Sequence, residues 1–374
     1  MDFYFDNAAT TVMSERAREA YIRTAQEFIG NPSSLHREGR KAKDELERRR
    51  ASIASCLGVQ PSSLIFTSGA TESIALVFQS LLWQEPGHVV ISRIEHEAVS
   101  SWSAILEKNG WSVTRLRARG GFVSPDELRD ALRSDTRLVA IMAVNNVTGA
   151  IQDTDALVKT VREHEKAVRH RVFFFSDSVQ ALGKTGLDLA SSDVDGASFS
   201  SHKINGPRGV GMLYLRNRDS IRLIAPAGGQ EGGKRGGTEN LPGIAAFAEA
   251  VSEWYEDRRG NEERIAAIKR EMMEKLIGYG LQILSPENSS PYILSFATPF
   301  PSEVFTRMLD DKGFSISSGS ACSNNAKGKS ESIYEAMGIR NNIASHAVRV
   351  SFSKDTKEEE ASALADAIKE IIHG

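Results

Sequence analysis

Lys203 follows a short apolar stretch, residues 197–200, and precedes a turn that contains Gly206 and Pro207. We interpret the stretch as a buried strand, and α/β sheets place functional groups at such strand ends. A lysine amine forms a Schiff base with a carbonyl compound once it has lost its proton, and its reference pKa is about 10.4. The alternative is a solubilising surface charge, and the residue alone does not decide between the two.

Asp177 comes two residues after the run Phe173-Phe174-Phe175. A carboxylate in such apolar surroundings is costly to bury unless a cation pairs with it. One interpretation is a solvated carboxylate or a helix N-cap at the end of a strand. The other is a partner for the protonated ring nitrogen of a pyridoxal cofactor, which lets the ring accept electrons.

Two glycine-containing segments are candidates for ligand contact. The stretch Ser68-Gly69-Ala70-Thr71 leads from a predicted strand into a predicted helix, whose first backbone N–H groups could bind a phosphate. The run from residue 228 to Thr238 holds too many glycines for regular structure, so it is a flexible linker or a loop that approaches a ligand closely. Arg235 and Thr238 within the run favour the loop.

The chain has two cysteines, too few for a disulfide framework, which indicates a reducing, cytoplasmic setting. Cys56 lies beside Leu57 in a predicted helix and is interpreted as inert packing. Cys322 lies in a Ser/Gly/Asn-rich stretch without an apolar period, so we expect an exposed thiol on a loop. A nucleophilic role would require a nearby cation or base, because a free thiol has a pKa of about 8.5.

Alternating apolar and amphipathic stretches indicate the elements that hold these residues. Apolar runs predict strands at residues 64–67, 88–94, 112–118, 138–144, 172–176, 197–200 and 209–215, the last two as a hairpin. Helices are predicted at residues 72–83, 97–108, 125–132 and 153–166. This alternation predicts an α/β fold: a large domain with a mostly parallel seven-stranded sheet covered by helices.

The pattern changes after about residue 240. Helices are predicted at 241–256, 261–279 and 303–312, strands at 281–284, 292–296 and 347–352, and a last helix begins near Thr356, with Glu359 at capping-box spacing. We expect residues 13–250 to form the large domain. Residues 1–12 together with 251–374 would form a smaller α+β domain that carries Cys322.

Composition excludes several classes of function. Hydrophobic residues make up 40% and charged residues 25% of the 374 residues, and the net charge of -3 gives no electrostatic footprint for nucleic acid. No apolar run reaches the length of a membrane span, and the acidic start of the chain does not resemble a secretory signal. The basic run Arg48-Arg49-Arg50 is interpreted as a solvated helix face. We assign no metal site.

Taken together, these segments resemble the cysteine desulfurases, which belong to the class-V aminotransferase group of fold-type-I pyridoxal-phosphate enzymes. The resemblance spans almost the whole chain, and its motifs occur in family order. They are residues 5–11 (FDNAATT), 30–36 (GNPSSLH), 68–73 (SGATES), Glu95-His96, 144–146 (VNN), 178–184 (SVQALGK), 200–203 (SSHK), 235–240 (RGGTEN), the Cys322 segment and 345–349 (SHAVR).

The resemblance implies a set of residues that bind pyridoxal 5'-phosphate within residues 13–250. Lys203 would hold the cofactor as a Schiff base and move the substrate Cα proton, while His96 would stack on the ring. Asp177 would pair with the ring nitrogen, and Gln180 would bond the ring hydroxyl. The phosphate would be held by Thr71, Ser200 and His202, with Thr238 reaching it from the second subunit of a homodimer. Ala70 would also bind the cofactor.

The resemblance also implies how L-cysteine is bound and used. Arg349, helped by Asn146, would clamp the substrate carboxylate through its two-pronged guanidinium. Cys322 would attack the substrate sulfur, which leaves a persulfide on the enzyme and releases alanine. Residues 323–332 resemble the longer loop version that delivers sulfur to a separate acceptor, such as an iron–sulfur scaffold protein.

Departures from the family pattern leave alternatives open. Val147 stands where an acidic residue is usual, and Ile74-Ala75 where asparagine is common, which puts substrate preference or rate in doubt. Selenocysteine lyase uses the same machinery and is the main rival. Another aminotransferase would have no use for the Cys322 thiol, and a non-catalytic binding protein would not need Lys203 or Arg349.

Overall fold

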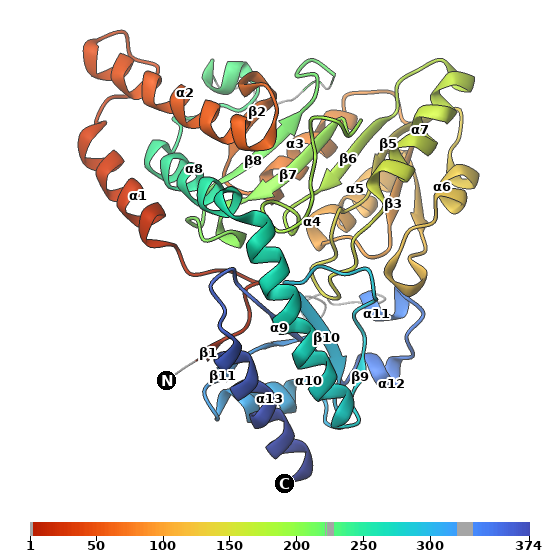
Figure 1. Cartoon of the computed structure of the whole chain (residues 1–374). Coiled ribbons are helices and arrows are strands. Elements are labelled where there is room, and N and C mark those ends of the chain that lie inside the picture. Colours follow the sequence, from red (N-terminus) through yellow and green to blue (C-terminus); the bar gives the residue numbers. More distant parts are fainter. Residues whose placement is uncertain (1–2, 221, 223–227, 320–331) are drawn as a thin grey trace.

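A seven-stranded sheet forms the centre of the larger part of the protein. The computed structural model describes residues 3–220, 222, 228–319 and 332–374, shown as a ribbon in Figure 1. The strand order is β2-β8-β7-β6-β5-β3-β4, with parallel pairing except where β8 meets β7 and β2. The strands are β2 Leu64–Thr67, β3 His88–Ser92, β4 Ser112–Leu116, β5 Thr136–Ala140, β6 Phe173–Asp177, β7 Gly196–Ser200 and β8 Gly211–Leu215. The predicted mostly parallel sheet and the β7–β8 hairpin are confirmed.

Both faces of this sheet are covered, as its continuously apolar strands require. Successive residues of β6 point to opposite faces. Phe173 and Phe175 pack in the cluster that contains α3 and α5, whereas Phe174 packs with residues of α6 and α7. Each buried phenylalanine stabilises the fold by about 1.5–3 kcal/mol.

The helices follow the sequence pattern with shifted ends. The predicted helix at 97–108 is two helices, α4 and α5, which meet at Ser101. Helix α8 has the predicted bounds, and α9 begins three residues earlier than predicted. The helices up to this point are α1 Glu15–Glu27, α2 Arg37–Leu57, α3 Ala70–Leu81, α4 Glu97–Ser100, α5 Trp102–Lys108, α6 Pro125–Ala131, α7 Thr154–Val168, α8 Leu241–Glu256 and α9 Arg258–Gly278.

A smaller antiparallel sheet of four strands lies beyond α9. Its order is β12-β13-β10-β9, with β9 Gln282–Ile283, β10 Ile293–Ala297, β12 Ser317–Ser318 and β13 Ala347–Ser351. A parallel pair, β1 Phe3–Tyr4 with β11 Phe314–Ser315, lies beside it. The helices here are α10 Ser302–Asp310, α11 Ile333–Ala336, α12 Asn341–Ala344 and α13 Glu358–His373. The division into domains at residue 250 stays a prediction.

The predicted capping box of the last helix was wrong. Helix α13 begins at Glu358, and the reciprocal bond runs from the Lys357 N–H to the carboxylate of Glu360. Thr356 instead accepts the N–H of Ser353 in the preceding turn. The hydroxyl is therefore already used one turn before the helix starts.

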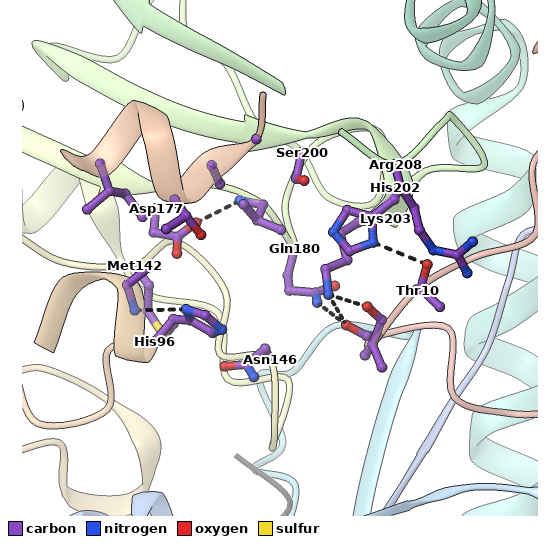
Figure 2. A pocket seen from close by; sticks show the side chains of 18 of the residues that line it. Thr10, His96, Met142, Asn146, Asp177, Gln180, Ser200, His202, Lys203 and Arg208 are labelled. Carbon is purple, nitrogen blue, oxygen red and sulfur yellow. Dashed lines mark hydrogen bonds between the residues drawn. The ribbon is translucent and has the colours of Figure 1, made fainter. Parts of the chain in front are cut away.

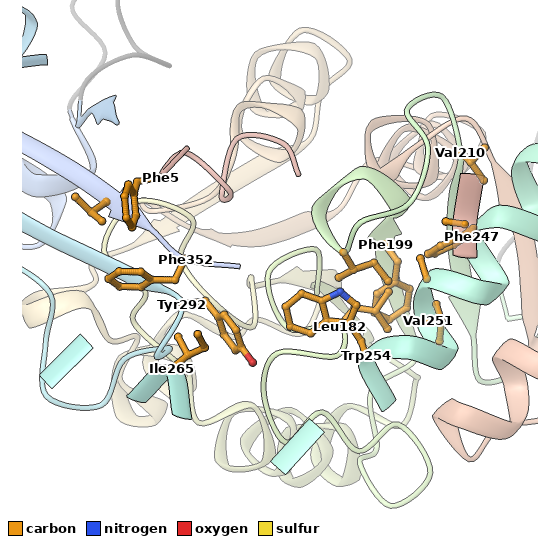
Figure 3. Close-up of a cluster of buried hydrophobic side chains, with 14 of the residues drawn as sticks. Phe5, Leu182, Phe199, Val210, Phe247, Val251, Trp254, Ile265, Tyr292 and Phe352 are labelled. Atoms are coloured by element: carbon orange, nitrogen blue, oxygen red, sulfur yellow. The ribbon is translucent and has the colours of Figure 1, made fainter. Parts of the chain in front are cut away.

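One hydrophobic cluster joins the two sheets (Figure 3). On the side of the large sheet it contains Phe199 and Phe247, and on the side of the small sheet it contains Phe352. Trp254 of α8 and Tyr292 lie between them, with ring centroids 5.2 Å apart. The relative position of the two sheets is therefore set by close packing rather than by a loose linker.

The interpretation of Arg48-Arg49-Arg50 as a solvated face was wrong for two of the three. Arg49 and Arg50 are buried on α2. Arg49 pairs with Glu249 of α8 at 2.6 Å, and Arg50 pairs with Glu231 at 2.8 Å. These carboxylates lie about 200 residues away along the chain, so local sequence gave no sign that the arginines would be neutralised.

No helix in the described ranges is long and apolar enough to cross a membrane.

Candidate active site

A cavity of about 690 Å³ opens where β6 and β7 end and the helix α3 begins. Its position at the carboxyl ends of parallel strands is the usual ligand site of an open α/β sheet. Figure 2 shows its polar side chains converging from several elements. Ten of the predicted site residues line it: Ala70, Thr71, His96, Asn146, Asp177, Gln180, Ser200, His202, Lys203 and Arg349.

Lys203 lies in a single 3₁₀ turn directly after β7, and its amine points into the cavity. Its Nζ donates to the backbone carbonyl oxygens of Ala8, at 2.9 Å, and Ala9, at 2.5 Å. The chain offers a second lysine nearby, Lys184, but that side chain is buried and does not line the cavity. Of these two lysines, Lys203 is the one that can reach a carbonyl compound in the cavity.

Asp177 is the last residue of β6 and is 7% exposed. Its Oδ1 accepts the N–H of Val179 at 3.1 Å and the hydroxyl of Ser198 at 3.3 Å. Burial raises the pKa of Asp177, while the positive charges of His96 and Lys203 and these hydrogen bonds oppose that rise. A buried carboxylate in this state gains stability from a cation placed in the cavity beside it.

The start of α3 forms one end of the cavity. Ala70 and Thr71 are its first residues, so unpaired backbone N–H groups face the space that Ser200 also borders. The backbone just before α3 lies against Gly211 of β8, where a Cβ would lie 2.4 Å from the Cα of Gly69. The neighbouring strand can therefore lie directly against the helix start.

His202 contributes a neutral imidazole to the same end. Burial, with the nearby charges of Lys203 and Arg208, lowers the pKa of His202 to about 4. Its Nδ1 lies 3.2 Å from the hydroxyl of Thr10. In the neutral form a ring N–H can donate to an anion, but the ring supplies no positive charge.

His96 forms the opposite wall and starts α4. Its Nδ1 accepts the N–H of Ala98 at 3.1 Å, which leaves Nε2 as the ring nitrogen that carries a proton. The residue before it, Glu95, is buried and bonds both Ser92 and the backbone N–H of Met142. Burial raises the pKa of Glu95 to about 8. Glu95 ties the ends of β3 and β5 together beneath His96, a role that sequence reasoning missed.

Arg349 of the small sheet meets Asn146, in the connection between β5 and α7, at the wall of the cavity. Arg349 lies in the middle of β13, 5% exposed, and donates to the backbone oxygen of Asn146 at 2.9 Å. It also pairs with Asp6 at 2.6 Å, a contact that sequence reasoning missed. The Nε of Arg349 and the Oδ1 of Asn146 are buried and have no hydrogen-bond partner among the described residues. A buried donor and acceptor left unpaired at a cavity wall favour a polar ligand there.

The first residues of the chain cross the site from one sheet to the other. Asp6 meets Arg349, and Ala8 accepts from Lys203 and from Gln180. Thr10 meets His202. The motif at residues 5–11 was recognised in the sequence, but its contacts were not predicted.

The glycine-rich run is a fixed loop over its described part, residues 228–238. Glu231 within it is buried and bonds Arg50 and the backbone N–H of Phe66, while Arg235 pairs with Glu72 of α3 at 2.8 Å. Thr238 is exposed and does not line the cavity of its own chain. Cys322 lies outside the described residues, so its predicted place on an exposed loop stays a prediction.

The residues around the cavity fit pyridoxal phosphate. A reachable lysine, a buried carboxylate that favours a cation, and a helix start that favours an anion correspond to the aldehyde, ring nitrogen and phosphate of that molecule. The unpartnered Arg349 Nε matches the carboxylate of an amino acid beside it. The roles of the individual residues stay predictions.

Comparisons with known proteins agree with this fold. The family model described as aminotransferase class-V matches residues 3–364. A protein of Lactobacillus delbrueckii subsp. bulgaricus named "NifS/IcsS protein homolog" is 40% identical, over 98% of this chain and 96% of that protein. A "Cysteine desulfurase IscS" of Dictyoglomus turgidum is 33% identical, over 99% of this chain and 94% of that protein. A solved structure titled "NIFS-LIKE PROTEIN" matches with a TM-score of 0.92 and 34% identity, over 100% of both chains. The fold, the cavity and these full-length matches place the chain in the cysteine desulfurase family of the class-V aminotransferases.

Proposed function

We propose that the protein is a pyridoxal-phosphate-dependent cysteine desulfurase, which converts L-cysteine to L-alanine and takes the sulfur onto Cys322. The observation that carries the proposal is a set of polar groups around one cavity that a bound ligand would pair with. Asp177 favours a cation, and the unpartnered Arg349 Nε and Asn146 Oδ1 favour the polar groups of an amino acid. Lys203 reaches the same space.

The chain's own residues bind, orient and move protons. Bound in the cavity, pyridoxal phosphate supplies an electron sink for charge that develops at the substrate Cα. Asp177 holds the positive charge of the ring nitrogen, and Arg349 orients the substrate carboxylate. Lys203, as an uncharged amine, takes the proton from the substrate Cα and later returns a proton to the product.

The sulfur step requires a thiolate. The Cys322 Sγ attacks the substrate sulfur, an S–S bond forms, and the substrate C–S bond breaks with its electron pair left on carbon. Protonation of that carbon gives alanine, and the enzyme keeps a persulfide, so no external oxidant is needed. We propose that the sulfur then passes to a separate acceptor protein in the cytoplasm, such as an iron–sulfur scaffold, because residues 323–332 resemble the long loop version.

The direct test incubates purified protein, loaded with pyridoxal phosphate, with L-cysteine and a thiol reductant. We expect alanine and sulfide in equal amounts. Protein that binds the cofactor but makes neither product would overturn the proposal, and transamination products instead would assign another class-V activity.

Selenocysteine lyase is the second candidate, since the same site accepts selenocysteine. The Cys322→Ser variant separates the two because selenium can leave without a protein nucleophile. We expect the variant to lose activity on cysteine while it keeps activity on selenocysteine. Wild-type protein that acts only on selenocysteine would make the lyase the correct assignment.

We also propose that the protein works as a homodimer in which Thr238 completes the partner's phosphate site. Thr238 is exposed and outside the cavity of its own chain. Large apolar side chains on or beside the first two helices are exposed as well, with Leu35 89% and Ile29 79% exposed. Mixed Lys203→Ala and Thr238→Ala subunits should regain part of the activity, whereas a fully active monomer in sedimentation would contradict the proposal.

A further inference from the structure

Lys184 is a buried lysine that the proposed chemistry does not use. It is 2% exposed, and its Nζ donates to the Oε1 of Gln180 at 3.0 Å. Its other close neighbour is the ring of Trp254, with Nζ 5.9 Å from the ring centroid. No carboxylate of the described residues pairs with it. Burying an ammonium group under these conditions costs stability, which calls for a compensating function.

The turn after β6 holds this lysine in place. Residues 178–185 form a series of tight turns, in which the N–H of Lys184 donates to the oxygen of Ala181. Gly183 has a φ of +70°, and a Cβ there would lie 2.8 Å from the Cβ of Trp254. Only glycine fits this position, so the turn lies flat against α8. The Nζ of the lysine reaches the side chain of Gln180, four residues earlier in the chain.

The contacts of Gln180 fix which way its amide points. A backbone carbonyl can only accept, so the Gln180 atom that faces the Ala8 carbonyl, at 2.9 Å, must be the amide nitrogen Nε2, and the amide oxygen Oε1 is left to accept from Lys184. The second hydrogen of Nε2 is left to donate to the cavity that Gln180 lines.

We propose that Lys184 is a positioning residue that holds the Gln180 amide with its nitrogen toward the cofactor. An inverted amide would present an oxygen to the ring oxygen and repel it. The inference rests on the proposed function, because it assumes that the cavity takes a pyridoxal cofactor whose ring oxygen needs a donor.

A lysine suits this task in either charge state. Burial, with the charges of Lys203 and Arg349, lowers the pKa of Lys184 to about 7. Both the ammonium and the neutral amine carry N–H groups, so Gln180 Oε1 has a donor in both forms. A carboxylate or a carbonyl at the same place would instead bind Nε2 and turn the amide around.

The test replaces Lys184 with methionine, which keeps the length of the side chain and removes the donor. We expect the apo-protein to bind pyridoxal phosphate about tenfold more weakly, as the loss of one oriented hydrogen bond implies. The measurement is a fluorescence titration of apo-protein with the cofactor. The absorbance band of the bound cofactor, which reports the charge of the ring oxygen, should shift as well.

Lys269 provides a matched control. It is a second buried lysine, 6% exposed, whose Nζ donates to Ser289 Oγ and the Ser290 oxygen at 2.8 Å each, away from the cavity. Lys269→Met should change the unfolding midpoint and leave the cofactor affinity unchanged. Equal losses of cofactor affinity in the two variants would show a general effect of buried lysines and overturn the proposal.

A double variant separates action through Gln180 from other effects. If Lys184 acts only by orienting the amide, Lys184→Met should add little to the affinity loss of Gln180→Leu. Additive losses would overturn the proposal, as would a Lys184→Met protein with wild-type affinity and absorbance. Wild-type protein that binds no pyridoxal phosphate would instead contradict the proposed function, so the two failures are distinguishable.

Discussion

The two sheets contribute to the cavity in different ways. The large sheet offers the ends of its strands: Asp177 closes β6 and Ser200 closes β7. The small sheet offers a side chain from the middle of a strand, since Arg349 pairs in register with Ser295 on one side and Ser317 on the other. Parallel strands end at a common edge, whereas an antiparallel sheet presents side chains from its face.

This difference separates two tasks. Groups that suit the cofactor come from the large sheet and its connections, whereas Arg349, which suits the substrate carboxylate, comes from the small sheet. Asn146 is the exception, because it suits the substrate but lies in the connection between β5 and α7. Changes in the large sheet should therefore alter cofactor binding, and changes in the small sheet should alter substrate binding.

Lys203→Ala should have the largest effect, because under the proposed function it removes both the Schiff-base amine and the proton carrier. Loss of a general acid–base group alone costs about 10²–10⁴ in rate. Activity should fall by at least that factor, and borohydride reduction should no longer fix the cofactor to the protein. Peptide mapping of reduced wild-type protein should place the adduct on Lys203, and an adduct on Lys184 would refute the assignment.

Cys322→Ser should nearly stop the release of alanine and sulfide without disturbing the groups of the large sheet. A hydroxyl cannot form a persulfide, but it does not alter Lys203 or Asp177. The variant should bind the cofactor with wild-type affinity and still change its absorbance when cysteine is added. Cys56→Ser is the control, since Cys56 packs against the core of α2 and burial raises its pKa. Full turnover by Cys322→Ser would show that the thiol does not take the sulfur.

Arg349→Ala should raise the Michaelis constant for cysteine at least tenfold, with little change in cofactor affinity. Removing one partner of a desolvated charge pair costs about 2–5 kcal/mol. Arg264 is a suitable control, because it bonds the backbone oxygen of Thr356 at 2.7 Å and does not line the cavity. An Arg349→Ala protein that loses the cofactor instead would break the separation between the two sheets.

His88 should have the smallest effect, and only on stability. It is the first residue of β3, at the end of the strand away from the cavity, and its ring nitrogens meet Thr136 and Thr114. Burial lowers the pKa of His88 to about 4. Below about pH 6.5 His88 binds a proton in the unfolded chain but not in the folded protein. The free energy of unfolding therefore falls as the pH falls.

Urea unfolding at a series of pH values measures this effect against His88→Gln, which does not titrate. Between pH 7 and pH 5 the wild type should lose about 2 kcal/mol relative to the variant. Unfolding free energies that change in parallel would show that His88 is protonated equally in both states.

Local pattern predicted the elements of the protein better than its long-range contacts. Helix α8 has its predicted bounds, and each of the seven strands of the large sheet overlaps a predicted apolar run, although β5, Thr136–Ala140, ends four residues before the predicted end at residue 144. The partners of Arg50 and Arg349 could not be predicted, since Glu231 and Asp6 lie 181 and 343 residues away. Ten of the predicted site residues line one cavity. They could be predicted only because the family motifs identified them, since periodicity does not show which distant residues come together.

The segment that crosses the site, residues 5–11, is synthesised long before the strand that it binds. Asn7 donates to the backbone oxygen of Ser351, 344 residues later in the chain. At about 5–20 residues per second, roughly 20–70 s separate the appearance of the two residues on the ribosome. During that interval the first residues have no β13 to bind, and they are accessible to chaperones and proteases.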